Sequence, residues 1–255
     1  DAKEYDALAA QIKQAFIGKF VQPGTGVVGN ATQGAQAFAL YYDLLPEADR
    51  RAALRELSEA VGRWDNHIAC GIFGVPALLT VLEREGLTEL AYDMVTQKSF
   101  PGWGHMLESG ATTLWETWKY SDNVYSHNHP MFGSVGEWFY QTLAGIRPSG
   151  PGFSRIDFRP QPAGELSWVK CGYESVRGEV ASHWQIEDGR FILEVTVPAG
   201  ATGRVWLPAG PGEAVTESGR SVDQAEAVVS LGYDGERACY LFEVGSGTYR
   251  FETAR

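Results

Sequence analysis

The sequence is poor in cysteine and in basic residues, and it has no long apolar run. Its three cysteines, Cys70, Cys171 and Cys239, are odd in number and show no Cys-x-x-Cys spacing. Neither a disulfide framework nor a zinc knuckle is therefore predicted, and reduced, buried thiols are expected. Lysine and arginine total 21 against 32 acidic residues, a net charge of −11. This charge disfavours nucleic acid as a partner, because its phosphates require a basic surface.

The chain also lacks a membrane segment and a signal pattern. No stretch approaches the roughly twenty apolar residues that span a bilayer, so no membrane partner is predicted. The sequence begins at Asp1 without a methionine and enters a helical pattern directly. We expect it to be a trimmed piece of something longer, and the localisation is then unknown, because any targeting segment would lie outside the piece.

What is present in the first 145 residues is a helical periodicity. Apolar residues recur at three- and four-residue steps, which indicates amphipathic helices separated by glycine-rich loops. The nearly all-apolar segment 71–85 is expected to be buried on most sides. The predicted helices are 5–20, 33–44, 46–63, 71–85, 88–98, 112–118 and 132–144.

The pattern changes at the segment 145–152, which contains three glycines and two prolines. Beyond it the apolar period is two, which predicts short strands and a β-sandwich. Trp168, Trp184 and Trp206 fall on alternating apolar positions, so we expect core packing for them in preference to a carbohydrate-binding strip. The predicted strands are 155–159, 182–186, 190–197, 203–207, 227–231, 239–244 and 247–251.

Residues 101–140 concentrate the polar and aromatic chemistry of the chain. They hold four of the eight tryptophans and three of the five histidines, together with three glutamates. Indole faces cover the apolar face of a pyranose, while carboxylates and imidazoles bind hydroxyls or move protons, so this composition is typical of a sugar site. The alternative is a tryptophan-rich core seam between helices.

Several motifs in this region resemble the bacterial α-L-rhamnosidases of glycoside hydrolase family 78. They are Pro101-Gly-Trp-Gly, Gly110-Ala-Thr-Thr-Leu-Trp-Glu-Thr-Trp118, and Ser126-His-Asn-His-Pro-Met-Phe-Gly-Ser-Val-Gly-Glu-Trp-Phe-Tyr140. The segments 67–74 and 197–208 are similar to further parts of that family. The resemblance therefore covers essentially the whole chain.

The resemblance implies an α and β multidomain fold, in which a partial (α/α)6 helical toroid is followed by an antiparallel β-sandwich. Residues 1–150 would be the second half of the helical catalytic domain, and residues 151–255 the complete C-terminal sandwich. The implied activity is inverting hydrolysis of terminal α-L-rhamnose from a rhamnosyl glycoside or oligosaccharide, without a cofactor.

The same resemblance implies roles for five residues. Glu116 matches the family's general base, and His129 matches a histidine that binds the sugar. Trp103, Trp115 and Trp118 are expected to form aromatic walls of the substrate pocket. In an inverting glycosidase the base works with an acid whose carboxyl group stands roughly 6.5–9.5 Å away.

The general acid is missing from the resemblance. The family's acid lies in an Arg-containing acidic motif, and nothing in this sequence is similar to it. Glu56, Glu59, Glu83 and Glu85 have the spacing of solvated charges on helix faces. The chain alone is therefore expected to lack the acid and to be inactive or nearly so.

Two other functions stay open on the sequence. The missing acid favours a non-catalytic carbohydrate-binding or scaffold protein, and Tyr125, His127, Asn128 and His129 are compatible with a polysaccharide lyase, although the acidic charge weakens binding of a polyanion. His127 and His129 lack a third ligand at fitting spacing, so no metal site is predicted. Because half a toroid leaves apolar faces without partners, self-association or pairing with the missing N-terminal half is expected through residues 1–100.

Overall fold

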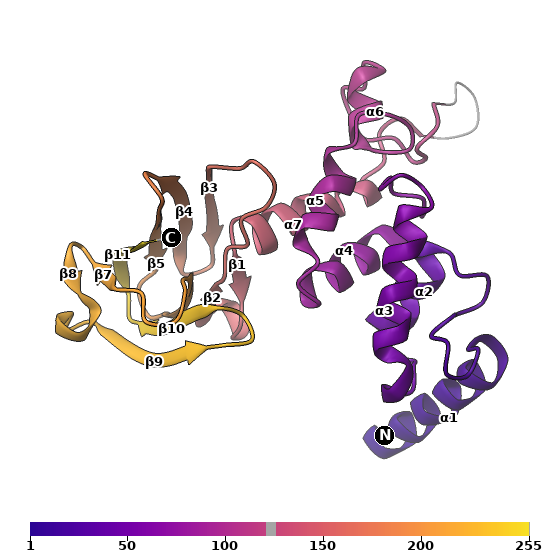
Figure 1. Cartoon of the computed structure of the whole chain (residues 1–255), viewed down its shortest axis with the longest axis horizontal. Coiled ribbons are helices and arrows are strands. Elements are labelled where there is room, and N and C mark those ends of the chain that lie inside the picture. The colour runs from indigo at the N-terminus through magenta and orange to yellow at the C-terminus, as the bar shows by residue number, and fades with distance from the viewer. Residues whose placement is uncertain (121–125, 255) are drawn as a thin grey trace. The chain divides into compact units, whose positions relative to one another are not determined.

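The computed structural model describes residues 1–120 and 126–254 of the chain. The residues form two compact units, which divide between Val135 and Gly136. The first unit is helical and the second consists of β-sheets preceded by short helical turns (Figure 1). The predicted order, helices followed by strands, is therefore confirmed.

The helical unit begins with five helices that match the first five predicted segments to within a few residues. A short α6 follows, and the segments after it are brief turns that lead toward the β unit. No helix in residues 1–120 or 126–254 is both long enough and apolar enough to cross a bilayer. The elements are α1 (Ala2–Phe20), α2 (Gln33–Tyr41), α3 (Glu47–Gly62), α4 (Gly74–Arg84), α5 (Thr88–Thr96), α6 (Trp103–Glu108), η1 (Met131–Gly133), α7 (Ser134–Trp138) and the π-helical turn η2 (Phe139–Leu143).

The core of the helical unit lies where α2 packs against α3 and α4. Helix α4 buries eight of its eleven residues, which confirms the expectation that it is covered on most sides. Leu78 and Leu82 on α4, and Leu57 on α3, are completely buried. Each such side chain contributes on the order of 1.5–3 kcal/mol to folding by leaving water.

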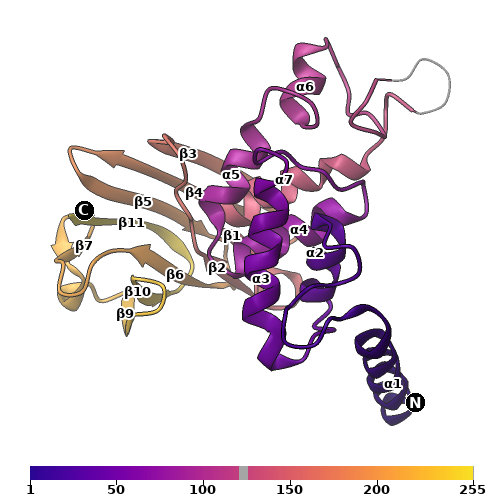
Figure 2. The ribbon, with the colours of Figure 1, turned by 45° about the vertical axis from the view of Figure 1, so that its right-hand side comes forward.

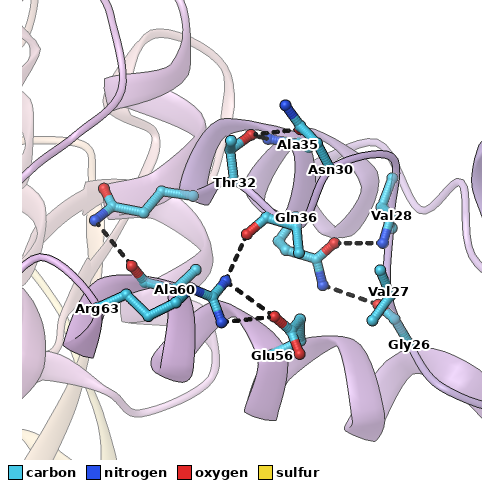
Figure 3. Close-up of polar contacts among 12 residues, drawn as sticks. Gly26, Val27, Val28, Asn30, Thr32, Ala35, Gln36, Glu56, Ala60 and Arg63 are labelled. Carbon is cyan, nitrogen blue, oxygen red and sulfur yellow. Dashed lines mark hydrogen bonds and ion pairs between the residues drawn. The ribbon is translucent and has the colours of Figure 1, made fainter.

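A buried glutamine ties the loop before α2 to this core (Figure 3). The Oε1 atom of Gln36 accepts a hydrogen bond from the Val28 N–H at 2.7 Å, and its Nε2 donates to the Gly26 carbonyl at 2.8 Å. A Cβ atom on Gly26 would lie 2.3 Å from the Ala53 nitrogen. Only glycine therefore allows the loop to lie this close to α3.

The start of α2 and the end of α3 are joined by polar groups in the same region (Figure 3). The Thr32 hydroxyl caps α2 by accepting from the Ala35 N–H at 3.3 Å. The Arg63 guanidinium donates to the Ala31 carbonyl at 2.6 Å and pairs with Glu56 at 3.0 Å. The Thr32 bond satisfies one of the N–H groups that the start of a helix leaves without an intrahelical partner, and Arg63 joins the end of α3 to the residue before this cap.

Helix α1 differs from the others because none of its residues is buried. Tyr5, Leu8 and Ile12 lie on its apolar stripe and are 69%, 48% and 55% exposed. Figures 1 and 2 both show α1 extending away from the remaining helices of this unit. Its amphipathic sequence thus predicts the helix correctly, but its apolar face is left uncovered in the described residues.

One predicted helix is wrong and one helix was not predicted. Residues 112–118 form bends without a helical turn, because their backbone groups pair with residues 126–129 instead of with each other. Helix α6 occupies Trp103–Glu108, in a segment that the glycines at 102 and 104 had favoured as a loop. In residues 131–143 the predicted single helix is divided into η1, α7 and η2.

The β unit contains two sheets that face each other (Figure 2). One sheet has the order β1-β2-β6-β10-β9 and the other has the order β3-β4-β5-β11-β7-β8. Neighbouring strands are antiparallel except for β2 and β6, which are parallel. The strands are β1 (Ile146–Pro148), β2 (Arg155–Phe158), β3 (Trp168–Ser175), β4 (Gly178–Glu187), β5 (Arg190–Val197), β6 (Thr202–Pro208), β7 (Val215–Glu217), β8 (Arg220–Ser221), β9 (Val228–Asp234), β10 (Cys239–Val244) and β11 (Gly247–Ala254), with the turns η3 (Pro151–Phe153) and η4 (Val222–Gln224) between them.

The inward faces of both sheets form one apolar core. Phe158 and Phe242 come from the first sheet, and Trp184, Phe191 and Phe251 from the second, and all five are at most 1% exposed. This interdigitation of two inner faces is that of a β-sandwich and agrees with the predicted alternation along the strands.

The three tryptophans of the β unit have different environments. Trp184 is completely buried, as expected, and its indole N–H donates to the Leu143 carbonyl at 2.6 Å. Trp206 on β6 is half-buried. The expectation of a core position is wrong for Trp168, which is 61% exposed, because β3 is the outermost strand of its sheet and the ring projects to solvent.

The cysteines provide a test of this packing. All three are free thiols, with Cys70 and Cys239 buried and Cys171 half-buried. Burial raises the pKa of the Cys70 thiol to about 12 and that of Cys239 to about 11. We therefore expect iodoacetamide at about pH 8 to alkylate Cys171 first in the native chain, as followed by peptide mass spectrometry, because the thiolate is the reactive form. Equal rates at the three sites without denaturant would contradict the packing.

Candidate active site

The longer loops of the helical unit gather at one end of its helices. The connections 42–46 and 85–87 are short, so the helices they join run in opposite directions. Loops 21–32, 63–73 and 97–102 consequently lie together at the other end, which we call the loop end. The polar and aromatic residues of the sequence motifs lie on α6 and in the segment that follows it.

Buried polar side chains hold the loop end in place. Gln33, at the start of α2, donates to the His67 carbonyl at 2.8 Å and accepts from the Ala69 N–H at 2.8 Å.

At the opposite end of the helices, Arg50 pairs with Asp43 at 2.9 Å and with Glu85. The Glu85 contact and burial oppose each other at Arg50, and the contact prevails, so the pKa of the guanidinium is raised.

Three contacts join the loops to one another. The Nε2 atom of His67 lies 2.7 Å from the Ser99 hydroxyl. The Trp118 indole N–H donates to the Cys70 carbonyl at 2.7 Å. A Cβ on Gly104 would lie 2.3 Å from the Gln97 carbonyl oxygen, so glycine is required where α6 begins against loop 97–102.

The segment after α6 folds back on itself as an irregular hairpin between residues 113–116 and 126–129. The Glu116 N–H donates to the Ser126 carbonyl at 2.9 Å, and the His129 N–H donates to the Leu114 carbonyl at 2.8 Å. The Thr113 hydroxyl adds a bond to the His127 carbonyl. These bonds replace the helix that the sequence predicts over 112–118.

This pairing sets the segment that carries Glu116 beside the segment that carries His129. Ser126 lies opposite Glu116 and His129 lies opposite Leu114, and residues that are directly opposite project to one face. Two residues separate Ser126 from His129 whereas one separates Leu114 from Glu116, so the second strand carries a bulge. Bulges occur next to active sites, where they redirect a side chain.

The carboxylate of Glu116 is oriented by the hairpin itself. Its Oε2 atom accepts the Ser126 N–H at 2.9 Å, so the same pair of residues is joined by both backbone and side chain. Within the described residues Oε1 has no hydrogen-bond partner. The carboxylate is therefore held through one oxygen among the described residues.

His129 is half-buried and oriented by its neighbour in the chain. Its Nδ1 atom accepts the Met131 N–H at 3.4 Å. A neutral imidazole that accepts at Nδ1 carries its proton at Nε2, so His129 presents a donor for an oxygen ligand.

The hairpin also carries an aromatic cluster. The His127 ring stacks on Tyr120 with 4.5 Å between centroids and lies 5.7 Å from Trp115. Trp115 in turn meets His105 edge to face at 6.3 Å. Trp115 is only 4% exposed, so it anchors the hairpin.

Trp103 and Trp118 form a second cluster with Phe132. Trp118 stacks on Phe132 at 3.7 Å, and Trp103 meets Trp118 edge to face at 5.0 Å. Both indoles are 8% exposed, and the Trp103 N–H donates to the Phe132 carbonyl at 3.1 Å. These rings hold the two ends of the hairpin together, and a contact of theirs with substrate stays a prediction.

The backbone pairing thus brings together the two segments that carry Glu116 and His129, while Trp103, Trp115 and Trp118 pack in two ring clusters of the same region. Of the residues considered for a lyase, Tyr125 lies outside the described residues, Asn128 is exposed, and His127 lies in the ring cluster of Trp115. Within residues 1–120 and 126–254, no group of three His, Cys, Asp or Glu side chains has metal-binding geometry.

The sequence did not indicate that Ser126 binds the Glu116 carboxylate or that His67 is hydrogen-bonded to Ser99. The two members of the pair are 32 residues apart, and neither lies in a motif that gives it a role. The length of the α4 and α5 hairpin brings them together, and no local pattern encodes that contact.

Comparison with known families identifies both parts of the chain. Residues 1–143 match the bacterial α-L-rhamnosidase six-hairpin glycosidase domain, and residues 145–221 match the bacterial α-L-rhamnosidase C-terminal domain. An α-L-rhamnosidase of Streptomyces avermitilis is 36% identical over 98% of the chain, but the match covers only 24% of that relative. The chain thus spans about a quarter of the length of this relative.

Solved structures give the same result. A crystal structure of the Streptomyces avermitilis α-L-rhamnosidase complexed with L-rhamnose superposes with a TM-score of 0.90 at 35% identity, covering 99% of this chain and 24% of that one. The α-L-rhamnosidase from Dictyoglumus thermophilum gives a TM-score of 0.88 at 35% identity, covering 99% and 29% of the two chains.

The role of the hydrogen bond from the Trp118 indole to the Cys70 carbonyl can be tested by measuring the free energy of unfolding. The substitution Trp118→Phe keeps an aromatic ring against Phe132 but removes the N–H donor. We expect the free energy of unfolding to fall by about 1–3 kcal/mol, because the buried carbonyl loses its partner. Urea unfolding followed by circular dichroism at 222 nm measures this, with Trp64→Phe on the surface as the control. Equal stability of the two variants would mean that the bond does not hold the loops.

Proposed function

Because the chain belongs to the bacterial α-L-rhamnosidase family, we propose that it supplies the base side of an inverting α-L-rhamnosidase active site. Residues 1–150 would be the second half of the (α/α)6 catalytic domain, and residues 151–255 its C-terminal β-sandwich. The alternating helix directions and the match of residues 1–143 to a six-hairpin glycosidase domain support this assignment. The substrate would be a rhamnosyl glycoside or oligosaccharide.

Glu116 is the general base in this proposal. Its carboxylate, held through Oε2, suits removal of a proton from a water molecule. The water oxygen then forms a bond to the anomeric carbon as the bond to the leaving oxygen breaks on the opposite face, which inverts the configuration. The observation that carries the assignment is the double link between Glu116 and Ser126, which positions the carboxylate before substrate binds.

His129 would bind a sugar hydroxyl through its Nε2–H, since it lies on the segment that pairs with the segment of Glu116. Trp103, Trp115 and Trp118 would support the pocket, and any ring edge they expose would contact the sugar. No residue in this proposal requires a cofactor.

The general acid would come from outside residues 1–255. Glu59 is exposed on α3 and makes no side-chain hydrogen bond or ion pair among the described residues, and Glu56 and Glu85 form ion pairs with Arg63 and Arg50. None of them has the isolated, loop-borne position of Glu116. The uncovered apolar stripe of α1 supports docking of the missing half of the toroid on residues 1–100, with self-association of the chain as the alternative.

Complementation tests the incomplete site. We expect the 255-residue chain to release no rhamnose from an aryl α-L-rhamnoside. Adding the N-terminal region of a related enzyme that contains the acid, in cis or in trans, should restore release, and sedimentation should show one complex in place of self-association. Selective rhamnose binding without hydrolysis by every complete form would instead favour a carbohydrate-binding protein.

Substitution of the base gives the second test. In the complemented enzyme, Glu116→Gln should lower kcat by about 10²–10⁴ with little change in KM, because the amide occupies the same space but cannot take a proton. Glu59→Gln is the matched control and should leave kcat unchanged. Full activity of the Glu116 variant would show that another residue is the base.

A further inference from the structure

The loop end carries a second group of polar and aromatic side chains, and these are exposed. Trp64 is 52% exposed and Phe100 is 51% exposed, whereas the three tryptophans near Glu116 are at most 8% exposed. The exposed rings belong to loops 63–73 and 97–102. A hydrogen bond between His67 and Ser99 joins these two loops.

The hydrogen bond between His67 and Ser99 has a defined donor and acceptor. The Nδ1 atom of His67 lies 2.8 Å from the Trp64 carbonyl and 3.0 Å from the Asp65 carbonyl, so Nδ1 carries the proton. Nε2 of the neutral ring then accepts the Ser99 hydroxyl proton at 2.7 Å. The lone pairs of the exposed Ser99 oxygen are left to accept a hydrogen bond from a ligand hydroxyl.

The turn between Trp64 and His67 displays two more polar side chains. Asp65 and Asn66 have φ angles of 48° and 58°, in the left-handed region that Asp and Asn tolerate better than most residues. The Gln97 side chain donates to the Asp65 carbonyl at 3.5 Å and helps to hold the turn. Among the described residues, neither the Asp65 carboxylate nor the Asn66 amide makes a hydrogen bond.

Two sets of contacts connect this group to the Glu116 hairpin. The first is the hydrogen bond from Trp118 to the Cys70 carbonyl in the Trp64 loop. The second runs through aromatic rings, with Phe100 and His105 at 5.4 Å and His105 and Trp115 at 6.3 Å. The group therefore lies at the same end of the helices as Glu116, on loops that are fixed relative to it.

We propose that Trp64, His67 and Ser99 form the subsite for the leaving group, and that this group is a neutral sugar. The inference rests on the proposed function, in which a terminal rhamnose occupies the pocket at Glu116 and the rest of the substrate extends from it. The exposed Trp64 ring stacks on the apolar face of the second sugar, and Ser99 accepts from one of its hydroxyls. The Asp65 carboxylate accepts from another hydroxyl and repels an anionic leaving group.

Kinetics with two substrates separates this subsite from the catalytic groups. α-L-Rhamnosyl fluoride has no second sugar, whereas a rhamnosyl-glucose disaccharide fills the proposed subsite. In the complemented enzyme, Trp64→Ala should lower kcat/KM for the disaccharide about tenfold and change that for the fluoride less than about twofold. Ser99→Ala should act in the same direction, and Ser99→Thr, which keeps the hydroxyl, should restore the wild-type value.

The control is Phe73→Ala, which removes another aromatic ring from the same loop. Phe73 is 71% exposed and lies outside the group, so neither substrate should be affected. Equal losses on both substrates in the Trp64 variant, or no loss on either, would overturn the subsite while leaving Glu116 as the base. Absence of fluoride hydrolysis by the complemented wild type would instead count against the proposed function.

Binding to the chain itself gives a readout that does not depend on catalysis. Saturation-transfer NMR with the disaccharide should show contact of the protein with protons of the glucose ring in the wild type and in Phe73→Ala. The signal should be lost in Trp64→Ala. Circular dichroism of each variant confirms that it is folded. An unchanged glucose signal in a folded Trp64→Ala variant would overturn the proposal.

Discussion

The arrangement of the candidate site depends on the backbone pairing between residues 114–116 and 126–129. Two interstrand hydrogen bonds fix which residues lie opposite each other, and the Glu116 carboxylate adds a third bond to the same partner, Ser126. Every other feature of the site follows from this register. It sets the segment of Glu116 beside that of His129 and lets the Trp115 and His127 rings meet, and it draws residues 112–118 out of the helical conformation that their apolar spacing favours.

The packing beneath the hairpin explains why it can keep this register without belonging to a sheet. An isolated two-stranded hairpin is marginal in water. Here one face is covered by the ring cluster of Trp115, and the end of the hairpin is held by the stacking of Trp118 on Phe132. The tryptophans that suggest sugar recognition in the sequence therefore pack against other rings in the described structure, and their contact with a sugar stays a prediction.

Much of the fold follows from the sequence, because the spacing of apolar residues indicates which side of a helix or strand is buried. The first five helices and most strands were predicted from apolar spacing, and Trp184 was placed in the core correctly. The failures have physical causes. Residues 112–118 pair with residues 126–129 in place of forming helical turns, and Trp168 lies on an outermost strand, where alternation no longer means burial. For the candidate site, Glu116 and His129 are predictions that rest on family motifs. The contact of His67 with Ser99 depends on the packing of α4 and α5, so no local sequence pattern indicates it.

The two ends of the helical unit are held by different kinds of contact. At one end, short connections and the Arg50 ion pairs join the helices closely and leave little room for a ligand. At the other end, the long loops expose many backbone groups, and Gln33, Gln36 and Arg63 satisfy part of this demand. Because these side chains fix the loops from within, the outward-facing groups of the same loops need not contribute to folding. The Trp64 ring, for example, makes none of these contacts and is 52% exposed.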